Sequence, residues 1–388
     1  MEIVTGPPVT GDKFYGRERE LKRMYDILTR TNASLFIPGP RRIGKSSLVK
    51  EFIRRYKDDF RFLYFNIQDK HSVIELCEDL FDELHERFPE LVKSRSKLKD
   101  IWNSIAEMIK RVKIAQLIDV ETGKLTKNAK KLLVKMEEVL EEVTKENVVI
   151  AMDEFSDFLL HLKRTGLQEV EYFLEWLRDL RHKEKVRLII TGSINIISTV
   201  RDMNVIDLIN DLTDIDIIHL SEKEIIDLLS QLLQSKHIEL GDKCMKYVAD
   251  KLSDGTPSYI QLFASGITQY VDDNSRVDNV KEIKSLYNQI TNKTHKEFEN
   301  FHSRLNEHLN DTENKAVLKT LAHLSDKPLS FDDLYPYVES LIPERKNLHR
   351  LLKRLMDECY IKSEDEMFDF VSPMLKDWWK KSYSWEKE

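Results

Sequence analysis

The stretch that decides the fold is Gly39-Pro40-Arg41-Arg42-Ile43-Gly44-Lys45-Ser46, which fits the pattern GxxxxGK[ST]. An apolar run, Ser34–Pro38, precedes it, and an amphipathic stretch from Ser47 to about Tyr56 follows it. This order of strand, loop and helix predicts a phosphate-binding loop, whereas a chance glycine-lysine turn needs no such context. The two glycines let successive backbone N–H groups converge on an anion, and the helix N-terminus adds partial positive charge there.

Two side chains complete the chemistry expected of this loop. Lys45 would bridge the terminal phosphates of a nucleotide, and the Ser46 hydroxyl would ligate Mg²⁺. We therefore expect ATP and Mg²⁺ to bind here. The loop residues expected to contact the nucleotide are Gly39, Pro40, Arg41, Arg42, Ile43, Gly44, Lys45, Ser46 and Ser47.

Short apolar runs around the loop predict a parallel sheet. They are rich in Val, Ile and Phe, mostly lack alternation, and are separated by amphipathic helical stretches. Such runs are typical of strands buried on both faces, and their spacing indicates βαβ units in an α/β fold. A stretch rich in Leu, Glu and Lys, about residues 72–145, predicts a helical insert at one edge of the sheet. The predicted strands are Ser34–Pro38, Phe62–Ile67, Val148–Met152, Leu188–Thr191 and Ile215–Leu220.

The composition indicates a folded, helix-rich chain. Of 388 residues only 11 are glycine, 33% are charged and 41% are hydrophobic, which excludes a disordered or low-complexity protein. A net charge of −7 argues against a polycation that coats nucleic acid but does not exclude a local basic face. The three cysteines match no zinc or disulfide spacing, and no apolar run approaches the roughly 20 residues that span a bilayer. We expect a soluble, cytoplasmic protein.

Two adjacent carboxylates follow one of the predicted strands, Val148–Met152. Downstream of a phosphate-binding loop, Asp153 would hold the water shell of Mg²⁺. Glu154 would polarise the water that attacks the γ-phosphate. An acidic cap on a strand is the alternative interpretation.

A second predicted strand, Leu188–Thr191, ends among small hydroxyl residues. A polar side chain at this point would sense the γ-phosphate or position water. Ser193 is the first candidate for this role, and Thr191 and Asn195 are the others. An ordinary turn after a strand would give the same residues.

The segment Phe14-Tyr15-Gly16-Arg17-Glu18-Arg19-Glu20-Leu21 resembles the F-x-G-R-E-x-E-L box of AAA+ and related signalling ATPases. The stretch Gly39–Leu48 is similar to the GPRR-x-GK-[ST]-SL loop of the archaeal-type ATPase family, which groups with STAND-like NTPases and has the Orc1/Cdc6 initiators among its relatives. This resemblance implies a P-loop NTPase sheet of AAA+ order 5-1-4-3-2, a helical lid and a winged helix. It also implies that Gly16 and Arg17 of the first box lie beside the nucleotide base. The lid would contribute Pro257, from a motif Gly255-x-Pro257, to the same place.

The chain departs from the family before the expected fifth strand. The family usually has an arginine there, in a short G-R element, whereas Asn210-Asp211-Leu212-Thr213-Asp214 is acidic. Arg201 is the nearest upstream candidate for a finger that acts on a neighbouring subunit. Because such an arginine is worth about 10³–10⁵ in rate, its lack puts efficient, oligomer-dependent hydrolysis in question.

We divide the chain into four parts. Residues 1–220 form the P-loop NTPase domain, 221–275 a helical lid, 276–310 a helical connector and 311–388 a winged-helix domain. In the lid, Ser221 with Glu224 three residues later predicts a capping box. The winged-helix elements are predicted as helices Thr312–Leu324 and Phe331–Val338, a third helix with Pro343 in its first turn, strands Tyr360–Lys362 and Phe368–Val371, and a last helix that begins at Ser372-Pro373.

The third helix of this segment has a basic face opposite an apolar one. Lys346, Arg350 and Lys353 follow one another at helical spacing, which suits contact with the phosphates of double-stranded DNA. The expected wing tip, Glu364-Asp365-Glu366, would repel that backbone. A solvated basic face, or a docking module for protein, is the alternative interpretation.

Two functions fit these observations. The first is an ATP-binding and ATP-hydrolysing AAA+/STAND-like ATPase whose winged helix binds double-stranded DNA. The alternative is a nucleotide-latched signalling switch with little turnover, which acts through a protein partner or a homo-oligomer. The missing arginine, the acidic wing and the long insert favour this second function.

Overall fold

The chain forms two compact units, and neither is one continuous stretch. The sheet unit consists of Gly16–Gly39 and Lys45–Ile217, and the helical unit consists of Met1–Tyr15, Pro40–Gly44 and Ile218–Glu388. The finer division into four parts stays a prediction. The computed structural model describes residues 1–31, 33–89, 96–117, 122–143, 147–182, 186–192, 196–274, 277, 279–294, 296, 298–299, 302–303 and 309–387.

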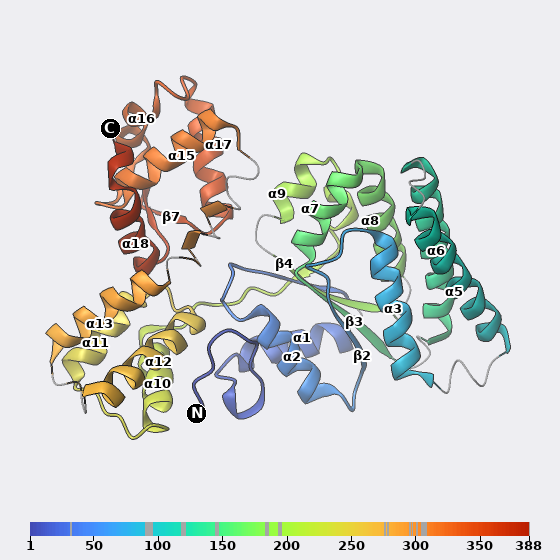
Figure 1. Cartoon of the computed structure of the whole chain (residues 1–388), viewed down its shortest axis with the longest axis horizontal. Coiled ribbons are helices and arrows are strands. Elements are labelled where there is room, and N and C mark those ends of the chain that lie inside the picture. Colours follow the sequence, from blue (N-terminus) through green and yellow to red (C-terminus); the bar gives the residue numbers. More distant parts are fainter. Residues whose placement is uncertain are drawn as a thin grey trace. The chain divides into compact units, whose positions relative to one another are not determined.

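The sheet unit alternates strands and helices, as the apolar runs predict (Figure 1). Its strands are β1 (Leu35–Pro38), β2 (Arg61–Asn66), β3 (Val148–Asp153), β4 (Arg187–Gly192) and β5 (Thr213–Asp214). Its helices are α1 (Glu18–Arg30), α2 (Lys45–Tyr56), α3 (Val73–Arg87), α5 (Ser96–Leu117), α6 (Thr122–Val143), α7 (Phe155–Thr165), α8 (Leu167–Arg181) and α9 (Ile196–Asp202).

Among the described residues of this unit, the five strands form a parallel sheet of order β2-β3-β4-β1-β5. This is the predicted order 5-1-4-3-2, read from the opposite edge. Every residue of β3 and of β4 is buried, because helices cover both faces of a parallel sheet. The order places the first strand, which leads into the phosphate-binding loop, beside β4, which in turn pairs with β3.

The fifth strand differs from its prediction. It covers Thr213–Asp214, with a further ladder bond from Ile215 N to Phe36 O at 2.8 Å, and not the predicted run Ile215–Leu220. The apolar run leaves the sheet because its second half has other surroundings: Ile218 is exposed, and Leu220 N donates to Gly255 O of the helical unit at 3.3 Å. The predicted apolar run therefore contains the point at which the chain leaves the sheet, after Ile215.

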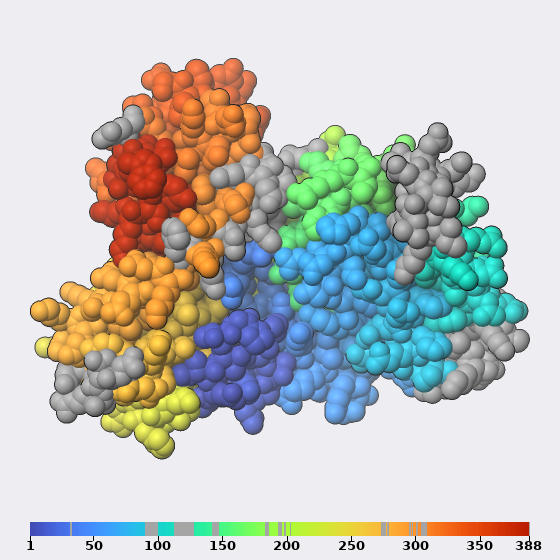
Figure 2. Space-filling model, viewed as in Figure 1, coloured from blue at the N-terminus to red at the C-terminus, as the bar shows by residue number. Residues whose placement is uncertain are grey.

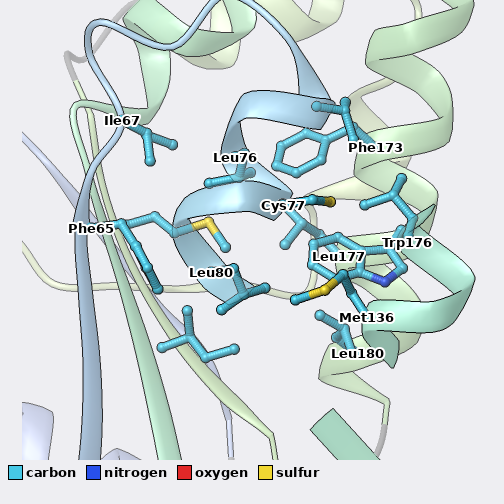
Figure 3. Close-up of a cluster of buried hydrophobic side chains, with 14 of the residues drawn as sticks. Phe65, Ile67, Leu76, Cys77, Leu80, Met136, Phe173, Trp176, Leu177 and Leu180 are labelled. Carbon is cyan, nitrogen blue, oxygen red and sulfur yellow. The ribbon is translucent and has the colours of Figure 1, made fainter. Parts of the chain in front are cut away.

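In the predicted insert, about residues 72–145, the described residues form the helices α3, α5 and α6, and α6 packs on α3 and α8. Figure 3 shows how this packing covers one face of the sheet: Phe65 of β2 faces Cys77 and Leu80 of α3, while Met136 of α6 and Trp176 of α8 enclose the other side of that helix. The insert therefore extends the hydrophobic core of the unit beyond the edge strand β2.

The helical unit begins with the leader, residues 1–13, which lies against helices far along the chain. Val4 N donates to Gln261 Oε1 at 3.0 Å, and Tyr15, just beyond the leader, donates its hydroxyl hydrogen to Asp227 Oδ2 at 2.6 Å. Figure 2 shows the leader, in dark blue, against the yellow and orange surface of these helices. The helices are α10 (Glu222–Gln234), α11 (Asp242–Lys251), α12 (Pro257–Asn274) and α13 (Val280–Lys293). The predicted capping box of Ser221 and Glu224 is present at α10.

The last part of the helical unit combines helices with a small antiparallel sheet of order β6-β8-β7. Its elements are α15 (Asp311–Leu324), β6 (Leu329–Ser330), α16 (Phe331–Val338), α17 (Arg345–Asp357), β7 (Ile361–Glu364), β8 (Met367–Phe370) and α18 (Pro373–Tyr383). The sequence pattern does not predict the two-residue strand β6, and Pro343 precedes α17 instead of lying in its first turn. Within the described ranges, no helix combines the length and the apolar character needed to cross a bilayer.

Candidate functional site

The phosphate-binding loop connects β1 with α2, as the sequence predicts. Lys45 is the first residue of α2; its side chain is buried, and its ammonium donates to Gly39 O at 2.9 Å. Gly44 has a φ of +105°, a backbone conformation that residues with a Cβ rarely adopt, and Arg42 has a φ of +71°. These left-handed positions curl the loop, while Ser46 and Ser47 stand half-buried in the first turn of α2.

The carboxylate of Asp153 ends β3 and is held on both oxygens. Its side chain is 1% exposed. The Tyr64 hydroxyl donates to Asp153 Oδ2 at 2.7 Å, and the Thr191 hydroxyl donates to Oδ1. A buried carboxylate with two hydroxyl donors is stabilised in one orientation, because turning it would break charge-assisted hydrogen bonds.

The strand register explains why these residues meet. Ile37 of β1 pairs with Thr191 of β4, and Met152 of β3 pairs with Ile190, so that Thr191 lies between the end of β1 and Asp153. The carboxyl ends of parallel strands share one edge of the sheet, where the loop also begins. Asp153, Thr191 and the start of the loop therefore gather at a single edge.

Glu154 follows Asp153 with a left-handed backbone, φ +61°, and is the N-cap residue of α7. Its backbone N–H donates to the Thr191 hydroxyl oxygen at 3.1 Å, so this hydroxyl links both acidic residues. The left-handed residue turns the chain sharply from strand to helix, and the carboxylate of Glu154 is half-buried, unlike that of Asp153. The two acids thus have different environments, as two different roles require.

A glycine allows α7 to start close to β4. A Cβ on Gly192 would lie 2.5 Å from the Ser156 hydroxyl oxygen, so close that the hydroxyl would have to move. Gly192 therefore favours close packing at the edge where Asp153 and Thr191 meet, because any larger residue must displace the Ser156 hydroxyl.

Tyr64 is the site residue that sequence reasoning missed. It lies within the strand Arg61–Asn66, for which the apolar pattern predicts only a buried run. The signal is a hydroxyl in a run of Phe and Leu residues near the carboxyl end of a strand. Burial, together with the neighbouring Asp153 carboxylate, raises the pKa of Tyr64 far above its usual value, so that it remains a donor.

The other predicted residues fall in several places. Ser193 and Asn195 lie outside the described residues, so Thr191 is the candidate that the structure places on Asp153. Gly16 and Arg17 are in the sheet unit; both have left-handed backbones, and Arg17 pairs with Glu20 at 3.1 Å. Pro257 begins α12 in the helical unit, and its role beside the base stays a prediction.

The acidic stretch before β5 has a structural partner. Asp211 accepts hydrogen bonds from the buried side chain of Arg181, on α8, at 2.6 and 2.9 Å. Burial raises the pKa of Asp211, but the hydrogen bond and the charge of Arg181 outweigh this and lower the pKa overall. Arg201, the candidate for the arginine finger, is exposed on α9.

The donor set at the sheet edge fits Mg²⁺. Ser46 supplies a hydroxyl oxygen at the start of α2, and Asp153 supplies a carboxylate that other hydroxyls already orient. Oxygen ligands of these kinds suit a hard cation, which protein sites usually bind with few direct ligands and several waters.

The comparisons with known proteins agree with this geometry. Residues 14–263 match the model of a family described as an ATPase domain predominantly from Archaea. The chain belongs to this family. The order of its five described strands is the one that the resemblance to AAA+ ATPases implies.

Among its archaeal relatives, an uncharacterized ATP-binding protein of Methanocaldococcus jannaschii is 30% identical over 167 residues, which is 40% of this chain and 45% of the relative. A second ATP-binding protein of that organism is 24% identical over 249 residues, or 61% of this chain and 60% of the relative. The chain thus spans about half the length of the curated relatives it matches.

A solved structure shows the same fold over nearly the whole chain. The Walker-type ATPase of Pyrococcus abyssi has a TM-score of 0.64 at 15% identity, with 98% of this chain and 100% of that chain covered. At this identity the likeness concerns the fold of the archaeal ATPase family and nothing beyond it.

Proposed function

We propose that the chain binds Mg·ATP at residues 39–47 and hydrolyses it. The observation that carries this proposal is the position of Asp153 and Glu154 at the end of β3: one carboxylate is buried and oriented, and the next is half-buried. Only β4 separates β3 from β1, the strand that leads into the loop with Lys45. In the proposed site the backbone N–H groups of the loop and the Lys45 ammonium bind the β- and γ-phosphates.

The bound Mg²⁺ would neutralise developing charge on the phosphate oxygens. Ser46 and Asp153 would hold it, Ser46 through its hydroxyl and Asp153 through a metal-bound water. Glu154 would accept a proton from the attacking water while the new bond forms between that water oxygen and the γ-phosphorus. The bond from this phosphorus to the bridging oxygen breaks, and ADP and phosphate leave.

Two substitutions test the two halves of this proposal. Lys45→Ala should weaken ATP binding in calorimetry, because it removes the cation at the terminal phosphates. Glu154→Gln should bind ATP as the wild type does but hydrolyse it about 10²–10⁴-fold more slowly, the usual worth of a general base. Glu171→Gln, an exposed carboxylate on α8, is the matched control and should hydrolyse at the wild-type rate.

Wild-type hydrolysis by Glu154→Gln would contradict the role of that residue, and unchanged affinity in Lys45→Ala would contradict the site as a whole. A wild-type protein that retains ATP through repeated washing without turning it over would favour the nucleotide-latched signalling switch, with a protein partner, over the ATPase.

We further propose that residues 311–388 form a winged helix that contacts double-stranded DNA. The observation in favour is the division of α17 into two faces. Leu348, Leu351, Leu352 and Leu355 are buried, whereas Lys346, Arg350 and Lys353 are exposed, which are the positions that phosphate contacts need. Lys346 also pairs with Glu344 at 2.7 Å, in an exposed ion pair that contributes little to stability.

The hairpin of β7 and β8 supports contacts through the helix and not through the wing tip. Asp365 and Glu366 form its two-residue turn with left-handed backbones, and both are exposed and acidic. A tip of this charge would be repelled by phosphates, so the proposed DNA contacts are confined to α17.

Retention on duplex DNA at several salt concentrations tests this second proposal. Wild-type binding should weaken with salt, and the triple variant Lys346/Arg350/Lys353→Glu should lose it. The matched control is the triple variant Lys243/Lys281/Lys293→Glu, which reverses the charge of three exposed lysines on α11 and α13. It should retain most of the DNA binding. Equal loss in both triple variants would mean that net charge and not α17 is responsible, which would contradict the proposal.

A further inference from the structure

We propose that Tyr64 is a positioning residue for the metal site: its hydroxyl holds Asp153 in the orientation that receives Mg²⁺. The inference rests on the proposed function, since it takes Asp153 to serve the metal. It adds a residue from β2, the edge strand of the sheet, to a site otherwise built from the loop, β3 and β4.

The strand register gives Tyr64 this reach. Asn66 pairs with Asp153 and Tyr64 pairs with Ala151, so all four side chains point to the same face of the sheet. Tyr64 thus lies two residues before the position opposite Asp153. Two residues along a strand span about 6.6 Å, which a tyrosine side chain covers and a serine or threonine does not.

The ring of Tyr64 is itself held in place. It is half-buried, and the Lys50 ammonium of α2 lies over it, 5.1 Å from the ring centroid. Lys50 is on the helix that begins at Lys45, so the contact ties this ring to the helix of the phosphate-binding loop. The Tyr64 hydroxyl lies 2.7 Å from Asp153 Oδ2, and because an ionised carboxylate can only accept, the hydroxyl is the donor.

Tyr64 and Thr191 together fix the carboxylate plane from two sides. Each donates to a different oxygen of Asp153, and a carboxylate oxygen accepts about two hydrogen bonds, so each oxygen retains one acceptor site. A metal-bound water can use such a site without displacing either hydroxyl. Without Tyr64, Asp153 Oδ2 would lose its donor and the carboxylate would be free to turn.

The expected loss of Mg²⁺ affinity can be judged from substitutions of residues that hydrogen-bond to metal ligands in other proteins. Removing a hydrogen-bond partner of a ligand typically costs about 10–100-fold in metal affinity. Tyr64→Phe removes only the hydroxyl and keeps the ring under Lys50. It should therefore raise the Mg²⁺ concentration needed for nucleotide binding by about 10-fold or more.

The experiment is a Mg²⁺ titration of the binding of a fluorescent ATP analogue to the full chain. Tyr64→Phe should need more Mg²⁺, while its nucleotide affinity in EDTA stays at the wild-type value. Tyr56→Phe is the matched control. Tyr56 is the last residue of α2, at the end remote from Lys45, and packs against Tyr25 and Phe52. Its variant should need the same Mg²⁺ concentration as the wild type. A wild-type Mg²⁺ requirement in Tyr64→Phe would overturn the inference.

Asp153→Asn separates this inference from the proposed function. If Asp153→Asn raises the Mg²⁺ requirement and Tyr64→Phe does not, the inference fails and the proposed function stands. If Asp153→Asn leaves the Mg²⁺ requirement unchanged, the proposed metal role of that residue fails and takes the inference with it. Adding Tyr64→Phe to Asp153→Asn should have no further effect, because the hydroxyl acts only through that carboxylate.

Discussion

The carboxyl edge of the sheet and the exposed face of α17 hold their polar side chains in opposite ways. At the sheet edge, Asp153 and Thr191 are buried and each has a defined partner. On α17 the basic side chains face solvent, and the buried leucines of the other face fix the helix. Single substitutions should therefore disturb the sheet unit, whereas on α17 only the combined charge should matter.

The largest stability effect is expected for Asp211→Ala. It leaves Arg181, whose side chain is 2% exposed, without its carboxylate partner. Removing one partner of a buried ion pair costs roughly 3–5 kcal/mol, and we expect about 2–4 kcal/mol because a third of the Asp211 side chain faces solvent. Urea unfolding at pH 7 measures this difference, and Asp207→Ala, a neighbouring acid, is the control.

The same variant has a pH dependence with a definite sign. Because the fold lowers the pKa of Asp211, its stabilisation is present above the unfolded pKa of about 3.9 and is lost as the pH falls through the folded value. The gap between wild type and Asp211→Ala should thus narrow below about pH 4. A gap that stays constant down to pH 3 would show that the charge of Asp211 does not contribute.

Thr191→Val should have the next largest effect on the fold. It removes the hydroxyl that donates to Asp153 and accepts from Glu154 N, with little change of shape. Leaving buried partners of this kind unsatisfied costs about 1–3 kcal/mol. Thermal or urea unfolding measures the loss, and Thr191→Ser, which retains the hydroxyl, should recover most of it. If valine and serine variants are equally stable, the hydroxyl is not the cause.

Gly192→Ala tests the close approach of α7 to β4. The new Cβ would lie 2.5 Å from the Ser156 hydroxyl oxygen, and overpacking of this kind costs about 1–3 kcal/mol. We expect a value near the lower end, because a hydroxyl can rotate away. Ser156→Gly in the same chain should restore part of the loss, and the double-mutant cycle measures that coupling. No coupling between the two sites would exclude this contact.

The smallest effect on stability is expected on α17. Arg350→Ala removes an exposed charge, and surface substitutions usually stay within about 0.5 kcal/mol. Its unfolding midpoint should match that of the wild type, while the DNA retention curve shifts only slightly. A loss of more than about 1 kcal/mol in the free energy of unfolding would mean that Arg350 is packed against other parts of the fold. The exposed face of α17 would then not differ from the sheet edge in this respect.

Local patterns in the sequence predict the loop and its strands well. Ser34–Pro38 agrees with β1 within one residue, because a buried strand, a glycine-rich loop and a helix each leave a local signal. The contact of Tyr64 with Asp153 joins residues 89 positions apart, and no local pattern encodes that pairing. The predicted bounds of β5 were wrong for the same reason: Leu220 is buried in the hydrophobic core of the helical unit, with helices far along the chain, and not in the sheet.

The leader has a consequence for how the chain is made. Val4 is synthesised 257 residues before its partner Gln261, and Tyr15 is synthesised 212 residues before Asp227. During translation, at about 5–20 residues per second, about ten seconds or more therefore pass between the synthesis of the leader and the synthesis of its partners in α10 and α12. The sheet unit has its strands complete before then, so we expect it to fold first and the helical unit to close last, around a segment that left the ribosome long before.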